Sequence, residues 1–239
     1  MVGHGQAPPT LRFYTWNPYA VSLGYLQSAP GGADLEACRR HGIELVRRIT
    51  GGRAVLHAHE LTYSVAIPSW HSWGSLSVVE LFSRISAGLI VGLERLGVAA
   101  SLGESRTTGE SESEAGACFL QRERPAILVR GRKLIGSAQR RWRRSLLQHG
   151  SILLDFDSHL HQAVFPAWPR SDPARGVTWL RALAGKVVCT DELTAILGSA
   201  WCQALRLSGV PGDLTPGERS MAQELAGRKY GSLAWTYLR

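Results

Sequence analysis

The sequence predicts an α/β fold, because segments with the composition of β-strands alternate along the chain with segments of helical spacing. The chain has 239 residues, of which 44% are hydrophobic, and this is enough to bury a sizeable core. It shows no internal repeat, and single domains of this length are common in the α/β class. We therefore expect residues 1–239 to form one domain.

Several segments are rich in β-branched and aromatic residues, which is typical of strands. They are LRFYTW (11–16), GIELVRR (42–48), ELTYSVAI (60–67), the pair AILV (126–129) and RKLIGSAQRR (132–141), and SILLDFD (151–157). Within the pair, Arg130 and Gly131 separate the two segments, which predicts the tight turn of a β-hairpin.

Helical signals are found in the middle and in the last third of the chain. From Leu76 onward, apolar residues recur at helical spacing until Gly97, which predicts one long helix. A second helix is expected to have Thr190 as its N-cap, because two carboxylates follow in the first turn and complement the helix dipole. A third is expected to open at Thr215, whose spacing from Glu218 is that of a capping box.

The charge pattern favours an acidic partner. The net charge is +8, and its positive charges come from 24 arginines and only three lysines. Basic residues are densest in and after the predicted hairpin, at Arg130, Arg132, Lys133, Arg140, Arg141, Arg143 and Arg144. Such a patch fits an acidic carrier protein, or a nucleic acid on whose bases Trp142 can stack; a solvated strand end is the ordinary alternative.

Hydropathy and cysteine content indicate a cytoplasmic protein. The longest apolar runs are far shorter than a membrane span, and the N-terminal residues lack the pattern of a signal peptide. The four cysteines, Cys38, Cys118, Cys189 and Cys202, show no CxxC spacing. We expect reduced thiols that are mostly buried as small hydrophobic residues.

Cys118 is nevertheless a candidate nucleophile, because it lies shortly before the predicted hairpin that contains Lys133. A nearby cation stabilises a thiolate over a thiol and lowers its pKa. The preceding segment, residues 101–116, is polar and contains glycine, which predicts a loop that is either a plain connection or a flap over Cys118. This combination favours acyl transfer.

The segment RRITGGRAVLH (47–57) is a second candidate for chemistry. Gly51 and Gly52 follow a predicted strand, and the backbone N–H groups of such a turn can hold an oxyanion or a phosphate. A simple turn explains a glycine pair equally well, and the segment matches neither the Walker pattern nor GxGxxG.

Two histidine pairs have the spacing of a metal half-site on a strand, His57 with His59 and His159 with His161. A third ligand at a recognisable spacing is missing from the sequence, so we expect no metal site. His149 is more typical of a structural histidine than of a general base. The loop at 68–75 places two tryptophans where they either line an apolar pocket or simply pack.

Four blocks in order resemble consecutive motifs of the biotin/lipoate protein ligase catalytic family. They are RFYTWNPYAVSLGYLQ (12–27), RRITGGRAVLHAHELTYSV (47–65), GRKLIGSAQRR (131–141) and LLQHGSILLD (146–155). The ending KYGSLAWTYLR is similar to the closing motif of the octanoyltransferase branch, and Cys118 with Phe119 is similar to its CF motif, where the ligases carry an RND-like motif. The resemblance implies a mixed β-sheet flanked by helices, like the catalytic core of class II aminoacyl-tRNA synthetases.

The same resemblance implies an octanoyltransferase that takes its acyl group from octanoyl-acyl carrier protein as a thioester on Cys118. The acceptor is implied to be a lysine of a lipoyl domain of 2-oxoacid dehydrogenases or of the glycine-cleavage H protein. Lys133 is implied to assist Cys118, without any cofactor. The implied acyl-binding residues are Arg47, Gly51, Gly52, Arg53, His57, Gly136, Ser137 and Ala138. We expect a monomer with neither nucleic acid nor membrane as a partner.

Two alternatives remain: an ATP-dependent lipoate-protein ligase, or a basic carrier-protein or nucleic-acid binding relative without activity. The sequence also departs from the family pattern at two places. Ala58 stands where the family often has aspartate after the histidine, which weakens a role for His57. A strand and a helix with a motif like NMALDEA normally precede the first block, so we expect the domain at 1–239 to lack them, through an upstream start or through divergence.

Overall fold

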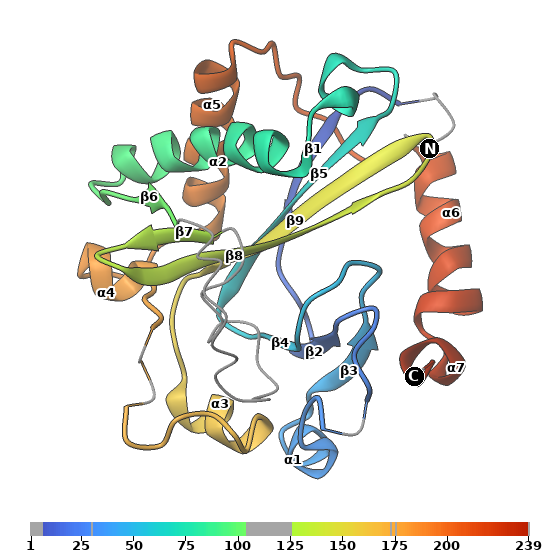
Figure 1. Cartoon of the computed structure of the whole chain (residues 1–239), viewed down its shortest axis with the longest axis vertical. Helices are drawn as coiled ribbons and strands as arrows, with labels where there is room; N and C mark the ends of the chain where they lie inside the picture. Colours follow the sequence, from blue (N-terminus) through green and yellow to red (C-terminus); the bar gives the residue numbers. More distant parts are fainter. Residues whose placement is uncertain (1–6, 30, 104–125, 173, 175, 239) are drawn as a thin grey trace.

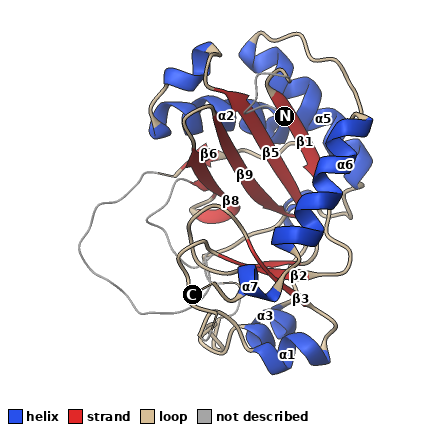
Figure 2. Cartoon of the chain, turned by 90° about the vertical axis from the view of Figure 1, so that its right-hand side faces the viewer, coloured by secondary structure: helices blue, strands red, loops and turns tan. Residues whose placement is uncertain are grey.

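The computed structural model describes residues 7–29, 31–103, 126–172, 174 and 176–238. It confirms the predicted α/β fold, in which two β-sheets are flanked by helices (Figure 1). Figure 2 shows the small sheet at one end of the large one, with two short helices beyond it. None of the helices in the described ranges is long and apolar enough to cross a membrane.

The large sheet, counted over the described residues, has six strands. Their order across the sheet is β1 (Thr10–Tyr14), β5 (Glu60–Pro68), β9 (Ser145–Leu153), β8 (Arg132–Arg141), β7 (Ala126–Val129) and β6 (Ser101–Leu102), and all neighbours are antiparallel. The predicted hairpin is confirmed: β7 and β8 are joined by Arg130 (φ 51°) and Gly131 (φ 74°). Two consecutive left-handed residues are the signature of a type I′ turn, whose twist matches that of the strands.

Strand β9 begins at Ser145, six residues earlier than predicted from the sequence, and this is a correction. Alternate residues of its first half are buried, at Leu146, Gln148 and Gly150. Two of these three are polar or lack a side chain, so the period of a half-buried strand is not visible in their hydropathy. Strand β9 ends at Leu153, and the following residues lead to an aspartate that caps the next helix.

Helices α2 (Val78–Arg95) and α5 (Thr190–Leu205) pack against each other on one face of the large sheet (Figure 1). The predicted end of α2 at Gly97 is confirmed by its left-handed φ of 76°. The predicted N-cap of α5 is wrong by one residue, because Cys189 holds that position and Thr190 is already helical. Helix α6 (Pro216–Leu225) has the predicted capping box between Thr215 and Glu218.

The small sheet contains β3 (Glu44–Arg47), β2 (Ala20–Leu23) and β4 (Val55–His57), with β2 parallel to β3 and antiparallel to β4. Of these three strands, only β3 was predicted from the sequence. Strand β4 is three residues long and β2 is buried on both faces, so neither shows an alternating pattern. The remaining helices are α1 (Leu35–Arg40), η2 (Ser72–Ser75), α3 (Ser158–Val164), α4 (Leu180–Ala184), the π-helix η4 (Ala226–Tyr230) and α7 (Leu233–Thr236).

Each sheet has its own apolar core. Trp73 belongs to the core between the large sheet and its helices, where it meets the edge of Trp201 with ring centroids 5.8 Å apart. Trp70 is 65% exposed, so the two tryptophans of the 68–75 loop do not form one pocket wall. Among the cysteines that the structure describes, Cys38 is buried but Cys189 is exposed, which corrects the expectation that most are buried.

Candidate functional site

The glycine turn that follows β3 lies against the face of β8 and β9 that points away from α2 and α5. Ala138 of β8 pairs with His149 of β9, and residues paired in this way point to the same face of a sheet. His149 Nε2 lies 2.6 Å from Oγ1 of Thr50, the residue before Gly51. Gly136, two residues from Ala138, shares that face. The structure therefore places the glycine turn on the side of the large sheet that Gly136 and Ala138 face.

Ser137 points the other way. Its Oγ lies 2.7 Å from the hydroxyl of Tyr63, which is fully buried in the core under α2 and α5. The Tyr63 hydroxyl also accepts a hydrogen bond of 3.1 Å from Gln148. The side chain of Ser137 thus supports the sheet from the helix-covered side.

Lys133 is buried in β8, with only 5% of its surface exposed. Ile135 pairs with Ile127 and Lys133 pairs with Leu128, so Leu134 is an extra residue that forms a β-bulge. One extra residue shifts the alternation of side chains by one position. Lys133 and Gly136 therefore face the same side of the sheet, the side on which the glycine turn lies. Its main chain is also hydrogen-bonded to the loop before α4.

Arg47, the last residue of β3, is 2% exposed and is committed to main-chain carbonyl groups. It donates to Gly24 O at 2.8 Å, to Gln27 O at 2.6 Å and to Thr236 O at 3.0 Å. In return, the indole N–H of Trp235 donates to Arg47 O at 2.9 Å. The predicted acyl-binding arginine therefore joins the C-terminal helix α7 to the loop after β2, a role that its position in the sequence does not reveal.

The neighbouring Arg48 was not predicted, although it holds the glycine turn directly. Its Nη2 donates to Gly51 O at 3.0 Å and to Arg53 O at 2.6 Å. Its Nη1 donates to Ser22 O at 2.7 Å. Between the two turn carbonyls lies Gly52, whose φ of 109° strongly favours glycine.

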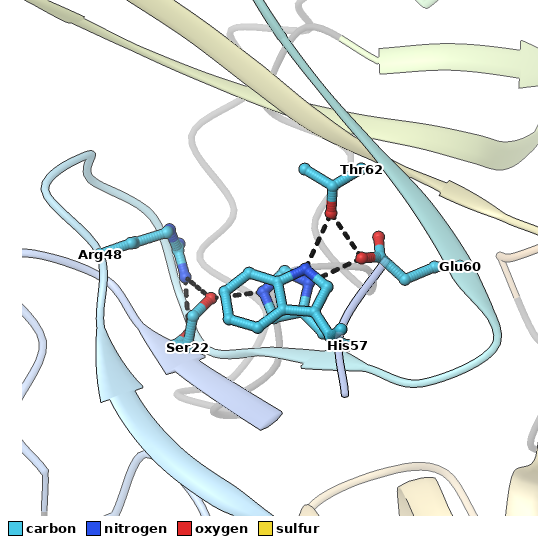
Figure 3. Close-up of polar contacts among 6 residues, drawn as sticks. Ser22, Arg48, His57, Glu60 and Thr62 are labelled. Atoms are coloured by element: carbon cyan, nitrogen blue, oxygen red, sulfur yellow. Dashed lines mark hydrogen bonds and ion pairs between the residues drawn. The ribbon is translucent and has the colours of Figure 1, made fainter. Parts of the chain in front are cut away.

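His57 is the centre of a buried hydrogen-bonded group (Figure 3). Its Nε2 lies 2.7 Å from Ser22 Oγ, and its Nδ1 lies 3.1 Å from Glu60 Oε1. Thr62 Oγ1 donates to the same carboxylate oxygen at 2.5 Å, and the indole of Trp16 donates to Thr62 Oγ1 at 2.9 Å. The Trp16 ring also stacks on the imidazole, with centroids 4.2 Å apart. Only the histidine of this group was predicted, because its partners come from two other strands, β2 and β5, and from the segment between β1 and β2.

Histidines elsewhere in the site region are structural. Burial, and then the charges of Arg48 and His57, lower the pKa of His149 to about 3, so this residue is neutral at physiological pH. His149 therefore fits the structural interpretation made from the sequence. Burial likewise lowers the pKa of His161 to about 4.

The histidine pairs do not have the geometry assumed from the sequence. His57 ends β4, whereas His59 lies in a left-handed turn with a φ of 52°, so the two do not share a strand face. His159 and His161 lie in α3 and not in a strand. Within the described parts of the chain, no group of three or more His, Cys, Asp or Glu side chains could hold a metal ion.

Cys118 and Phe119 lie outside the described residues, as does most of the predicted loop at 101–116. Of that loop, Ser101 and Leu102 form the short strand β6.

Four of the seven residues of the predicted basic patch, Arg140, Arg141, Arg143 and Arg144, lie at or beside the turn between β8 and β9. Arg130 and Arg132 lie at the other end of β8, and Lys133 is buried, so the seven residues do not form one surface, which corrects the prediction. Arg141, Trp142, Arg143 and Arg144 are all exposed at the β8–β9 turn. Arg140, at the base of this turn, lies over the ring of Tyr25 at 4.3 Å and over the ring of Trp142 at 5.4 Å. These residues form an exposed basic and aromatic surface, the β8–β9 arginine surface.

The chain belongs to the lipoyl protein ligase A/B catalytic domain family, whose model matches residues 1–201. Two solved members of this class have the same fold. A putative lipoate protein ligase from T. acidophilum with bound lipoic acid is 25% identical, with a TM-score of 0.78 over 98% of this chain and 87% of that chain. Lipoate-protein ligase A bound with ATP is also 25% identical, with a TM-score of 0.79 over 97% of this chain and 87% of that chain.

The curated relatives found with this chain are more similar in sequence than these structures. A protein named octanoyltransferase LipM from Kyrpidia tusciae is 40% identical over 99% of this chain and 90% of its own length. A protein of the same name from Symbiobacterium thermophilum is 41% identical over 98% of this chain and 88% of its own length. The octanoyltransferase LipM of Bacillus subtilis is 36% identical over 97% of this chain and 87% of its own length.

Proposed function

We propose that this protein moves an octanoyl group from acyl carrier protein, through a thioester on Cys118, to a lysine of a lipoyl domain or of the glycine-cleavage H protein. The protein is an enzyme of the octanoyltransferase class in lipoate biosynthesis. The observation that supports the finer proposal best is the near full-length similarity to proteins named octanoyltransferase LipM, together with a cysteine at position 118.

In the first step, the thiolate of Cys118 attacks the carbonyl carbon of the octanoyl thioester. The bond from that carbon to the pantetheine sulfur breaks, and the pantetheine thiolate leaves and takes up a proton. Lys133 stabilises the cysteine thiolate and the oxyanion that forms on the carbonyl oxygen. Two observations support this role: Lys133 is buried, and it faces the same side of the sheet as Gly136. A charge removed from water acts more strongly on nearby groups.

In the second step, the neutral amine of the acceptor lysine attacks the carbonyl carbon of the Cys118 thioester. The carbon–sulfur bond breaks, the thiolate is restored, and the nitrogen loses a proton as the amide forms. An amide is more stable than a thioester, so the step requires no ATP.

The acyl group is proposed to lie between the glycine turn and the turn-facing side of β8. Gly51, Gly52 and Arg53 form one wall, and the small residues Gly136 and Ala138 leave room on the other. His57 borders the turn through Ser22 and Arg48, and Ser137 and Arg47 fix the two walls from outside.

The acyl carrier protein is proposed to dock on the β8–β9 arginine surface. Arg141, Arg143 and Arg144 are exposed there and complement an acidic carrier. Arg140 donates to Ile49 O at 2.6 Å, two residues before Gly51, so the surface continues directly into the glycine turn. A prosthetic arm anchored there can reach the turn without crossing the large sheet.

The test is intact-protein mass spectrometry after the purified enzyme is mixed with octanoyl-acyl carrier protein. The expected result is one octanoyl adduct on the wild type, absent from Cys118→Ala and lost when a lipoyl-domain acceptor is added. A well-folded wild type without an adduct contradicts the thioester relay.

A second candidate is an ATP-dependent lipoate-protein ligase, because the structural likeness to lipoate-protein ligase A bound with ATP extends over 97% of this chain. Formation of an acyl-adenylate from octanoate and ATP that survives Cys118→Ala supports this candidate against the transferase.

A further inference from the structure

Four side chains from separate segments form one chain of hydrogen bonds that ends on the glycine turn (Figure 3). The order is Glu60, His57, Ser22 and Arg48, and we name these four residues the Arg48 relay. Glu60 begins β5, His57 ends β4, Ser22 lies in β2, and Arg48 follows β3. The relay therefore connects the large sheet to all strands of the small sheet in the described part of the chain.

The guanidinium of Arg48 can only donate, so Ser22 Oγ accepts from Arg48 Nη1 at 3.2 Å. Ser22 Oγ also lies 2.7 Å from His57 Nε2, and His57 Nδ1 lies 3.1 Å from Glu60 Oε1. One arrangement of protons that satisfies these bonds places the Ser22 hydroxyl proton toward Nε2 and the imidazole proton on Nδ1, toward Glu60.

The order of atoms is that of a serine–histidine–carboxylate triad, but the surroundings exclude a nucleophilic serine. Ser22 is 1% exposed, and its Oγ already accepts an N–H from Arg48. His57 is 6% exposed and Glu60 is 4% exposed. In such a buried setting, hydrogen bonds are strong and hold their geometry. The three side chains therefore bind the guanidinium of Arg48 through Ser22 and fix the orientation of that group.

Arg48 passes this orientation to the turn. Its Nη2 holds the carbonyl groups of Gly51 and Arg53, on either side of Gly52. The main-chain N–H groups of Gly51 and Gly52 donate to no other residue that the structure describes. A turn whose carbonyl groups are fixed, and whose N–H groups are not used by the described residues, is suited to hold an oxyanion.

We propose that the Arg48 relay is a positioning device that aims the N–H groups of Gly51 and Gly52 at the carbonyl oxygen of the bound acyl thioester. Arg48 is the positioning residue that acts on the turn, and Ser22, His57 and Glu60 act through it. This inference rests on the proposed acyl transfer, because the thioester carbonyl is the group that the turn receives.

The test compares Arg48→Lys and Ser22→Ala with the wild type in two measurements. The first is the rate at which octanoyl-acyl carrier protein acylates the enzyme, followed by rapid quench and intact-protein mass spectrometry. Lysine keeps the charge of Arg48 but cannot reach three carbonyl groups and a hydroxyl together. We expect a maximal acylation rate lower by about 100-fold in Arg48→Lys and by about tenfold in Ser22→Ala, as for lost oxyanion stabilisation, with half-saturation unchanged.

The matched controls are Ser86→Ala, which removes another buried serine hydroxyl from α2, and Arg95→Lys on the outer side of α2. Both are expected to acylate like the wild type. Ser22→Thr keeps the hydroxyl and is expected to recover most of the rate lost in Ser22→Ala. Wild-type rates in both Arg48→Lys and Ser22→Ala, or an equal loss in Ser86→Ala, overturn the proposal.

The second measurement does not depend on activity. Backbone order parameters of Gly51 and Gly52, measured by NMR relaxation, are expected to fall in Arg48→Lys and in Ser22→Ala but not in Ser86→Ala. Unchanged order parameters overturn the positioning role even if the wild type forms no adduct. A wild type without an adduct but with the expected order parameters refutes the proposed function, while the relay still holds the turn for another ligand.

Discussion

Gly24 and Gly52 approach each other so closely that a Cβ atom on Gly24 would lie 1.7 Å from Gly52 O. Gly24 directly follows the small-sheet strand β2, and Gly52 lies in the glycine turn before β4. The residues next to each glycine are bound by Arg47 and Arg48. The shape of the turn therefore depends on a main-chain contact that any side chain would break.

The change Gly24→Ala is expected to displace the turn and to lower acyl transfer more than stability. Overpacking of this kind typically costs about 1–3 kcal/mol of the free energy of unfolding. We expect a cost in that range by urea unfolding and a much larger fractional loss in the rate of enzyme acylation. Gly212→Ala is the matched control, since no atom lies within 4 Å of a Cβ atom there. A variant that loses stability but acylates at the wild-type rate contradicts this prediction.

The contact between α2 and α5 gives a prediction about stability alone. A Cβ atom on Gly88 would lie 2.1 Å from Cδ1 of Trp201, whose indole donates to Ile85 O at 3.1 Å. Gly88→Ala is therefore expected to lower the free energy of unfolding by about 1–3 kcal/mol, because the helices must separate. Gly198→Ala in α5 has no atom within 4 Å and is expected to be neutral or to stabilise by up to about 1 kcal/mol. Thermal unfolding of both variants checks the contrast, and equal effects would refute it.

Much of the large sheet could be predicted from the sequence, because the residues that specify its elements lie next to one another in the chain. The hairpin turn at Arg130 and Gly131 and the helix ending at Gly97 depend on neighbouring residues only. Strands β2 and β4 were missed because a short strand buried on both faces has no alternation. Their existence follows from pairing with distant segments, which local patterns do not report.

The candidate site could be predicted only in part, for a related reason. The glycine turn and His57 stand in one block of sequence, and the resemblance to a known family identified them. Ser22 and Glu60 lie in strands, and nothing in the neighbouring sequence distinguishes them from other buried polar residues. Only the fold brings them to His57. Arg47 and Arg48 are adjacent in sequence but serve different partners, because successive residues of an extended segment point to opposite sides.

The pH dependence of stability is expected to reflect His149. Its pKa of about 3 in the folded protein lies below the ordinary value of 6.5, so the unfolded chain binds the proton more readily. The contribution of this group to stability is therefore complete above pH 6.5 and decreases as the pH falls from there toward 3. Burial depresses the pKa of His161 to about 4, which adds to the same slope.

Urea unfolding at a series of pH values between 7.5 and 5 measures this slope. His149→Asn keeps a polar side chain near Thr50 but cannot titrate, so its slope is expected to be smaller than that of the wild type. A variant with the wild-type slope assigns the effect to other groups.

Lys133→Ala is expected to slow the acylation of Cys118 while the fold stays intact. Loss of a cation that stabilises a thiolate and an oxyanion typically lowers a rate by about 100-fold or more. The effect is expected to shrink at high pH, because hydroxide then supplies the thiolate that Lys133 favours at neutral pH. Iodoacetamide labelling of Cys118 over a pH series checks the thiolate separately, and an unchanged labelling profile with unchanged acylation removes Lys133 from the mechanism.

The β8–β9 arginine surface is expected to govern binding of the acyl carrier and not the chemistry. Arg143→Glu with Arg144→Glu reverses two exposed charges at the turn, so an acidic carrier is repelled. We expect KM for octanoyl-acyl carrier protein to rise by about tenfold or more, and kcat to change little, with the difference shrinking as salt screens the charges. Arg39→Glu, an exposed arginine on α1, is the matched control. A short octanoyl thioester of free pantetheine lacks the carrier, and the double variant is expected to use it as well as the wild type does. Equal losses with both donors would place these arginines at the acyl site and refute carrier docking here.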